Sequence, residues 1–325
     1  MTPEQARIGA LARFAIAITT LNVLGHLVLG FEVSVLQTVV CVITAYIVEI
    51  TLEVAGAWSE NRQPAFLGGG FKKLIIFLLP AHISGVACGM LIYPGDRLLP
   101  FVFAAAIAIS SKSIFTIMVA GRRRHVFNPS NTGIVATAFL FPSVTPVAPY
   151  EFTEGLSGYW LWALPVIFVC AGSFLNMRFT KKMPLIISWL TAFAVQAIIR
   201  HLLYPTSLPL GLAPMTGVAF LLFTFYMITD PQTSPSSVRG QIIFGCSLAA
   251  VYAVLIALHV VFTIFVALFV VCLCRGIILY VSTFAPVRRA QLLAEQLWLT
   301  LYGRLFSLRS VPAASGDMME RVPRS

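Results

Sequence analysis

The chain has 325 residues, of which 58% are hydrophobic and only 10% are charged. This apolar content exceeds what the core of a soluble globular domain needs, so the composition indicates an all-α polytopic membrane protein. The formal net charge of +10 is typical of nucleic-acid-binding proteins, but Lys and Arg lie in short loops between apolar segments. We therefore expect the chain to lie in a lipid bilayer and to bind no nucleic acid.

Ten apolar segments follow one another along the chain, and each is expected to be a transmembrane helix. They are residues 10–29, 33–52, 74–92, 99–120, 131–141, 158–175, 184–203, 216–229, 241–258 and 260–281. The fifth and eighth are short, which fits broken helices or equally boundaries drawn too tightly. Residues 1–10 are polar and no small-residue cleavage site follows the first segment, so we expect the first helix to stay in the mature protein.

Basic residues alternate between successive loops, which predicts the orientation of the chain. The basic loops carry Arg7, Arg13, Arg62, Lys72, Lys73, Arg122, Arg123, Arg124, Arg178, Lys181, Lys182, Arg239, Arg288 and Arg289. The opposite loops hold only Arg97 and Arg200. We therefore expect both termini and the basic loops in the cytoplasm, and the loop 142–155, with Glu151 and Glu154, outside.

Three regions are expected from this pattern: a transmembrane domain over residues 1–285, an interfacial amphipathic helix over 286–309 and a disordered cytoplasmic tail over 310–325. The second region alternates apolar with polar and basic residues, which is typical of a helix lying in the membrane surface. Its apolar members are Leu292, Leu293, Leu297, Trp298, Leu301, Leu305 and Phe306.

All six cysteines fall within apolar segments, without the close loop spacing of zinc or iron–sulfur sites, so we expect buried structural thiols and no metal. His26 and His259 lie near the predicted outer ends of the first and tenth segments, and His82 lies within the third. Two facing histidines can ligate haem, but hydrogen bonding near the interface is the commoner role of such residues.

Glu49 and Lys112 are charged residues inside predicted spans, where an unpaired charge is costly. Lys112 is expected about 12 Å from the cytoplasmic end of the fourth segment and Glu49 at a comparable depth in the second. A Glu49–Lys112 ion pair, structural or part of an ion pathway, would satisfy both groups. Snorkelling of Lys112 to the interface is an equally good explanation.

Two short stretches combine a capping side chain with a proline at the cytoplasmic boundary of a short segment. Asn128-Pro129-Ser130-Asn131-Thr132-Gly133 precedes the fifth segment, and Thr229-Asp230-Pro231-Gln232-Thr233-Ser234-Pro235 follows the eighth. Each alone is explained by a membrane-boundary turn. Pro214-Met215-Thr216-Gly217-Val218 echoes the first stretch, which suggests an internal repeat.

In this order, with Glu154-Gly155-Leu156-Ser157-Gly158 between them, the stretches resemble the RnfD/NqrB family over about residues 112–239. This family comprises membrane proteins of the Rnf electron-transport complex and of the sodium-pumping NADH:quinone oxidoreductase. The nearest resemblance is to UnbU-type members known from enediyne biosynthesis clusters. It implies two repeats of five helices, a fold shared with urea channels, and a place in a bacterial inner membrane beside other redox subunits.

The same resemblance implies a site for covalent FMN at the outer end of the sixth segment, on a threonine that ends the motif Asp-Gly-[Leu/Phe]-[Ser/Thr]-Gly-Ala-Thr. Here Ser157-Gly158-Tyr159-Trp160 occupies the corresponding positions. Because Trp160 has no hydroxyl, no covalent FMN is expected, whereas a noncovalent flavin or quinone is possible. An aromatic belt explains Tyr159 and Trp160 better than a flavin-stacking role.

Two functions follow as expectations: a membrane subunit of an Rnf-like electron-transport system, or a channel or transporter on the same fold. Whether the chain is itself an enzyme is left open. The residues expected at a cofactor site are Ser157, Gly158, Tyr159, Trp160, Asn128, Thr229 and Asp230. The substrate, any translocated ion and the oligomeric state do not follow from the sequence.

Overall fold

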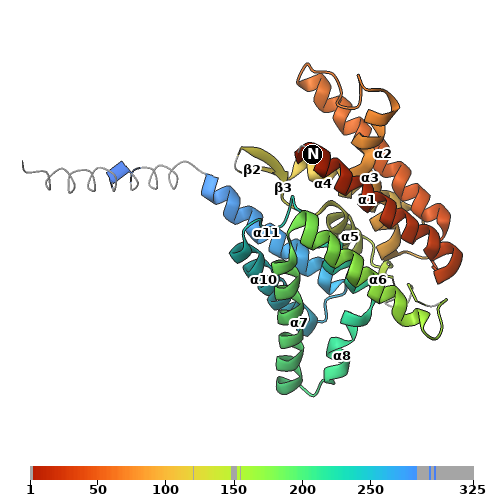
Figure 1. Cartoon of the computed structure of the whole chain (residues 1–325), viewed down its shortest axis with the longest axis vertical. Helices are drawn as coiled ribbons and strands as arrows, with labels where there is room; N and C mark the ends of the chain where they lie inside the picture. Colours follow the sequence, from red (N-terminus) through yellow and green to blue (C-terminus); the bar gives the residue numbers. More distant parts are fainter. Residues whose placement is uncertain are drawn as a thin grey trace, which may run out of the picture. The chain divides into compact units, whose positions relative to one another are not determined.

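The computed structural model describes residues 3–119, 121–147, 152–153, 155–283, 293 and 296–297. The first half of the chain contains the helices α1 (Pro3–Leu24), η1 (Gly25–Leu29), α2 (Val35–Ser59), α3 (Gly70–Leu91), α4 (Leu99–Ile114) and α5 (Pro129–Leu140). The second contains α6 (Trp160–Leu175), η2 (Asn176–Thr180), α7 (Met183–Leu203), α8 (Leu208–Leu212), η3 (Ala213–Thr216), α9 (Val218–Leu222), η4 (Phe223–Met227), α10 (Val238–Ala257) and α11 (Thr263–Thr283) (Figure 1).

Strands are few in the described part of the chain. β1 (Ile92–Tyr93) pairs with β4 (Thr145–Pro146), and β2 (Thr116–Val119) pairs with β3 (Arg122–His125), both antiparallel. The chain divides into two compact units, Met1–Gly276 and Ile277–Ser325, and every contact described below lies within the first.

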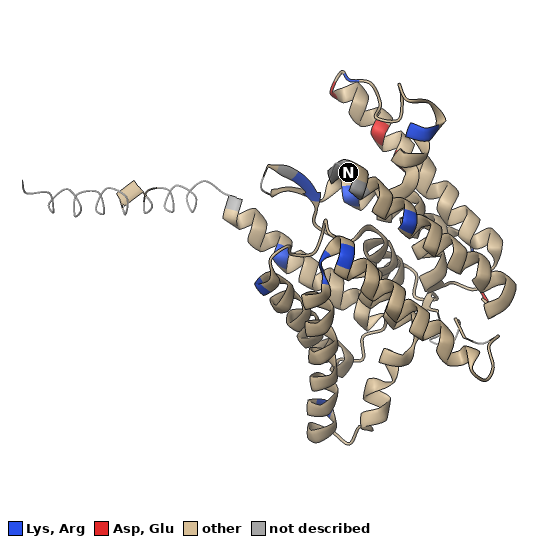
Figure 2. Ribbon diagram, viewed as in Figure 1, with Lys and Arg blue, Asp and Glu red and all other residues tan. Residues whose placement is uncertain are grey.

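Seven of the described helical segments are long and apolar enough to cross a membrane: Ile8–Leu29, Val35–Ser59, Gly70–Leu91, Trp160–Thr180, Met183–Leu203, Val238–Ala257 and Thr263–Ser282. The pair Leu208–Thr216 and Val218–Met227, bent by 65° at its break, adds an eighth if it counts as one span. Most residues of the helices in Figure 2 are uncharged, being none of Lys, Arg, Asp or Glu. The protein is therefore an all-α polytopic membrane protein, as its composition predicts.

Each of the ten predicted segments contains helix, but α4, α5 and the helices of the eighth segment are short. α4 has 16 residues and α5 has 12, so they are about 24 and 18 Å long, against about 30 Å of hydrocarbon. Both are largely buried by other parts of the chain. Length alone thus supports seven or eight crossings rather than ten. The short eighth segment is a broken helix, one of its two predicted explanations.

The predicted fourth segment, 99–120, is wrong in its last third. α4 ends at Ile114, and Thr116–Val119 forms the first strand of a hairpin in which Thr116 pairs with His125. A short apolar run fits a strand as well as a helix, which is why the pattern misled. Gly121, with φ of +74°, supplies the left-handed backbone of the turn.

Glycines allow the closest helix contacts in this bundle. A Cβ at Gly133 of α5 would collide with the carbonyl oxygen of Ala104 in α4, and one at Gly245 of α10 would lie 2.9 Å from the Leu185 carbonyl oxygen in α7. Small residues at such crossings let membrane helices approach closely. Gly133 ends the first of the two proline stretches, so its packing role accounts for the glycine there.

Several predictions fall on residues outside the described ranges. The interfacial helix over 286–309, except Leu293, Gln296 and Leu297, and the tail over 310–325 lie there, as do Glu151 and Glu154 of the outer loop. The two five-helix repeats stay a prediction.

Candidate functional site

The two proline stretches meet in space although about a hundred residues separate them. Asn128 is the N-cap of α5, where its side-chain oxygen accepts a hydrogen bond from the Asn131 N–H at 3.1 Å. Its Nδ2 donates to the Met227 carbonyl at 3.3 Å and lies 3.5 Å from Asp230 Oδ2. The amide of the first stretch therefore contacts the end of η4 and the carboxylate of the second.

Asp230 is the acidic centre of this contact, and we call Asp230, Asn128 and His125 the Asp230 junction. His125 Nε2, from β3, lies 3.1 Å from Asp230 Oδ2, and the Gln232 N–H donates to Oδ1 at 2.9 Å. Burial by itself raises the pKa of Asp230, but the hydrogen bond and charge of His125 and the Gln232 N–H outweigh it, so the pKa lies below its usual value. The carboxylate is thus held ionised in a partly buried site.

Two cations fix the loop that follows Asp230. Lys182 is only 3% exposed, and its Nζ donates to the Pro235 carbonyl at 2.5 Å and to the Ser234 carbonyl at 3.4 Å. Arg275 donates to the Thr233 carbonyl at 2.8 Å. Burial lowers the pKa of Lys182 to about 8, the charges of Arg124 and Arg275 add to this, and Asp230 opposes it. Carbonyl dipoles of the second stretch therefore stabilise the positive charges of Lys182 and Arg275.

Thr229 has a local role in helix termination. Its hydroxyl donates to the Phe225 carbonyl at 2.7 Å, inside the π-helical turn η4. Asn176, the first residue of the π-helical turn η2, donates to the same carbonyl at 2.8 Å. A π-helical turn changes which carbonyls are paired within the helix. Here the Thr229 hydroxyl and the Asn176 amide both donate to the Phe225 carbonyl. Thr229 thus orders the backbone that leads into Asp230.

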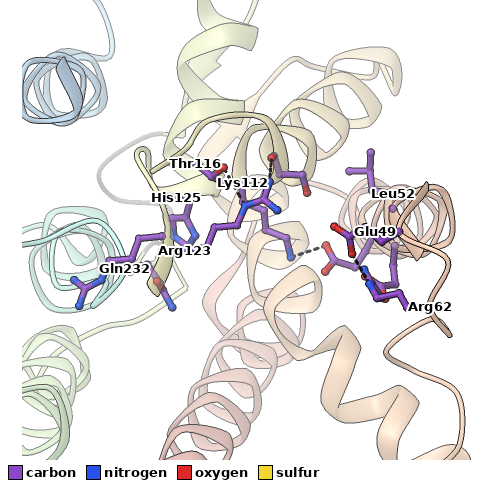
Figure 3. A pocket seen from close by; sticks show the side chains of 13 residues that line it. Glu49, Leu52, Arg62, Lys112, Thr116, Arg123, His125 and Gln232 are labelled. Carbon is purple, nitrogen blue, oxygen red and sulfur yellow. Dashed lines mark hydrogen bonds and ion pairs between the residues drawn. The ribbon is translucent and has the colours of Figure 1, made fainter. Parts of the chain in front are cut away.

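A cavity of about 410 Å³ adjoins the junction. It is lined by Glu49, Leu52, Glu53, Gly56, Glu60, Arg62, Lys112, Ser113, Thr116, Arg123, Arg124, His125 and Gln232. Figure 3 shows Arg123, His125 and Gln232 on one side of it and Glu49, Leu52 and Arg62 on the other. The end of the first unit that carries this cavity, Lys182 and Arg275 is called the basic end.

The acidic groups of the cavity are paired with cations. Lys112 Nζ lies 2.5 Å from Glu49 Oε2, and the two side chains are only 16% and 12% exposed. Arg62 lies 2.5 Å from Glu53 and 2.6 Å from Glu60. Arg123, in contrast, donates to the neutral oxygens of Thr116 and Ser113. Arg62 is shared by two carboxylates, but the lining holds Arg62, Lys112, Arg123 and Arg124 against Glu49, Glu53 and Glu60, so the net charge of the cavity is positive, with Arg123 and Arg124 on the β2–β3 hairpin.

The predicted contact between Glu49 and Lys112 is confirmed, but the predicted depth of Lys112 is wrong. Because α4 ends at Ile114, Lys112 lies in its last turn and not about 12 Å from its end. Glu49 lies about 15 Å from the end of α2 at Ser59. Lys112 thus contacts the Glu49 carboxylate on the side that faces the cavity. A role of the pair in an ion pathway stays a prediction.

The four residues Ser157 to Trp160 lie elsewhere. Trp160 is the first residue of α6 and the other three precede it, with Tyr159 96% and Trp160 69% exposed. Trp160 is about 24 Å along the helix from Asn176, which contacts η4. The structure therefore brings Asn128, Thr229 and Asp230 together and leaves Ser157, Gly158, Tyr159 and Trp160 apart from them. Their exposure fits an aromatic belt at a membrane surface.

Three residues of the site were not predicted from the sequence: His125, Lys182 and Arg275. Arg275 carried a usable signal, since it is an arginine inside the last apolar segment. His125 and Lys182 lie in stretches rich in basic residues, where nothing in the sequence sets them apart. In the described part of the chain, no three His, Cys, Asp or Glu side chains are grouped so that they could hold a metal ion.

No family model matches this chain. Two curated proteins are similar to part of it: the D subunit of the ion-translocating oxidoreductase complex from Pectobacterium atrosepticum and its counterpart from Pectobacterium carotovorum subsp. carotovorum. Each is 30% identical over 95 residues, which is 29% of this chain. The match spans 27% of the length of each relative.

Proposed function

We propose that the chain is a membrane subunit of an electron-transport assembly related to the complex of its two partial relatives. The observation that carries this proposal is the Asp230 junction, where two separate stretches that resemble one redox-subunit family form a single contact. Two boundary turns without a common function would not be expected to contact each other. The oriented charges beside it suit a site where a reduced cofactor gains negative charge.

The finer placement, among UnbU-type proteins and beside the sodium-pumping quinone oxidoreductases, rests on the altered flavin motif. Trp160 offers no hydroxyl for a phosphate ester, so the chain holds no covalent FMN there. A noncovalent flavin or quinone near the Asp230 junction is the cofactor we infer, because His125 and Gln232 carry hydrogen-bonding side chains and line the cavity beside the junction.

A channel or transporter is the second candidate. The bent pair Leu208–Thr216 and Val218–Met227 favours it, since broken helices often flank transport sites in membranes. The two candidates differ in their partners: an electron-transport subunit needs a donor and an acceptor protein, whereas a channel functions alone.

Capture of partners tests the proposed function. A photo-crosslinking side chain introduced at Arg123, at the basic end, should capture a flavin- or iron–sulfur-bearing protein in the native membrane. The same group at Ser157, at the other end of α6, serves as the matched control. On a denaturing gel of the sample, the chain itself should show no flavin fluorescence. Capture of no redox protein would contradict the function, and fluorescence on the chain would contradict the absence of covalent FMN.

We infer further that the basic end faces the cytoplasm of a bacterial inner membrane, with both termini on that side, because Lys and Arg concentrate there. In intact cells, an impermeant thiol reagent should label a cysteine introduced at Ser157 and spare one introduced at Arg123. The opposite labelling pattern would reverse the orientation.

A further inference from the structure

A hydrogen-bonded triad lies inside the membrane-spanning part of the first unit. His82 of α3 has Nδ1 2.7 Å from the Tyr46 hydroxyl of α2 and Nε2 2.7 Å from the Thr19 hydroxyl of α1. His82 is about 18 Å along α3 from Gly70 and about 14 Å from Leu91. The imidazole therefore lies near the middle of its span, where an ionisable group is costly and is for that reason a candidate functional site.

The hydrogen bonds assign the tautomer of His82. The Thr19 hydroxyl donates its single proton to the Ala15 carbonyl at 2.7 Å, so towards His82 it can only accept. Nε2 must then carry a proton and donate it. In the neutral ring Nδ1 keeps a lone pair, which accepts the Tyr46 O–H. Every N–H and O–H hydrogen of the triad is thus donated in a hydrogen bond, and Nδ1 is the atom that can accept a further proton.

Proton uptake at Nδ1 reverses one hydrogen bond and leaves the other unchanged. Tyr46 passes its hydroxyl proton to Nδ1 and takes a replacement proton from its other side, so the imidazole becomes positive and the phenol stays neutral. The replacement comes from the direction of Glu49, which lies one turn further along the same face of α2. The net reaction is the binding of one proton, with no oxidant or reductant involved.

Glu49 connects this face of α2 to water. It lines the 410 Å³ cavity at the basic end and is paired there with Lys112. Glu49 of the cavity, Tyr46 one turn away on α2, and His82 beside Tyr46 thus follow one another as a track from the basic end to the middle of α3. The other titratable or charged side chains on helices packed against α3, among those described, are Arg13 and Cys41, together with Glu53 beside Arg62.

Beyond His82, towards the other end of α3, the packing closes. A Cβ at Gly85 would lie 2.9 Å from the Val42 Cα of α2, and one at Gly89 would lie 3.0 Å from the Thr38 Cα. Backbones this close leave no room for a file of water between α2 and α3. Residues 84–91 are all buried. The track is therefore open towards one end of the bundle only.

We propose that His82 is an intramembrane proton-binding site, filled from the basic end through the cavity, Glu49 and Tyr46, and closed to the opposite end. Its ligand is a proton, and its function is to bring one positive charge to the middle of the membrane. If the proposed function holds, this charge balances an electron that the subunit carries. The site itself depends only on contacts among α1, α2 and α3, whatever the proposed function.

The charge state of His82 in a bilayer tests the proposal. The full chain, with ¹⁵N-labelled histidine, is reconstituted in lipid vesicles whose sidedness is read from a cysteine introduced at Arg123. Solid-state NMR then follows the ring nitrogens, and the resonances lost in His82→Gln assign the residue. At neutral pH the ring should show a protonated Nε2 and a bare Nδ1. Acidification between about pH 8 and 5 at the basic end should charge it, whereas acidification of the other side should not.

Two variants localise the track. Tyr46→Phe removes one oxygen, and Glu49→Gln combined with Lys112→Gln removes both charges of the pair without leaving one unpaired. Each should abolish the charging of His82 from the basic end within the time of the wild-type response. His201→Gln, at the end of α7, is the matched control and should change nothing. The proposal would be overturned if His82 stayed neutral on acidification, if it became charged on acidification of the opposite side, or if it responded as in wild type in both variants.

Discussion

Replacement of Lys112 by alanine is expected to destabilise the protein by about 3 kcal/mol, because it leaves Glu49 charged and without its cation in a largely buried site. Glu49→Gln should have a similar effect by stranding Lys112. The double replacement Glu49→Gln/Lys112→Gln should be less harmful than the sum of the singles, since it removes both charges. Loss of folded protein on heating in mild detergent measures all three.

Lys72→Ala is the matched control for this cycle. Lys72 is an exposed lysine in the first turn of α3, so its removal should cost less than about 0.5 kcal/mol. The cycle gives the coupling between Glu49 and Lys112 directly. Additive losses, or a Lys112→Ala protein as stable as Lys72→Ala, would show that the ion pair contributes nothing to the fold.

Much of the architecture could be predicted because hydrophobic length alone identifies a membrane helix. That signal placed α3, α7, α10 and α11 within about four residues, but it ended the second segment at Leu52 although α2 continues to Ser59. It failed after Ile114, where Thr116–Val119 forms a strand instead of continuing α4. Apolar content does not separate the two structures over so short a run; pairing with β3 decides, and pairing depends on residues further along the chain.

The candidate site was predictable in part for a similar reason. A charge inside an apolar segment needs a partner, so Glu49 and Lys112 pointed to each other. Asn128 and Asp230 were recognisable as capping residues beside prolines, but their mutual contact depends on how α5 and η4 pack. His125 and Lys182 were hidden among the basic residues that orient the chain. Their roles come from the hairpin and from burial, which local sequence does not encode.

The relation between the Asp230 junction and its cofactor can also be probed by substitution. Asp230→Asn removes the charge that His125 faces at 3.1 Å and keeps the size of the side chain. Asp96→Asn, in the exposed loop before α4, is the matched control. We expect the first variant to lose a noncovalently bound flavin or quinone and the second to retain it as wild type does.

The visible and near-ultraviolet absorption spectrum of the gently purified chain, recorded before and after reduction with dithionite, tests the electron-transport role most directly. We predict a reversible change typical of a flavin or a quinone in wild type and in Asp96→Asn, and its loss in Asp230→Asn. A wild-type protein with no chromophore, no extractable quinone and no response to dithionite would contradict the electron-transport role and favour a channel or transporter.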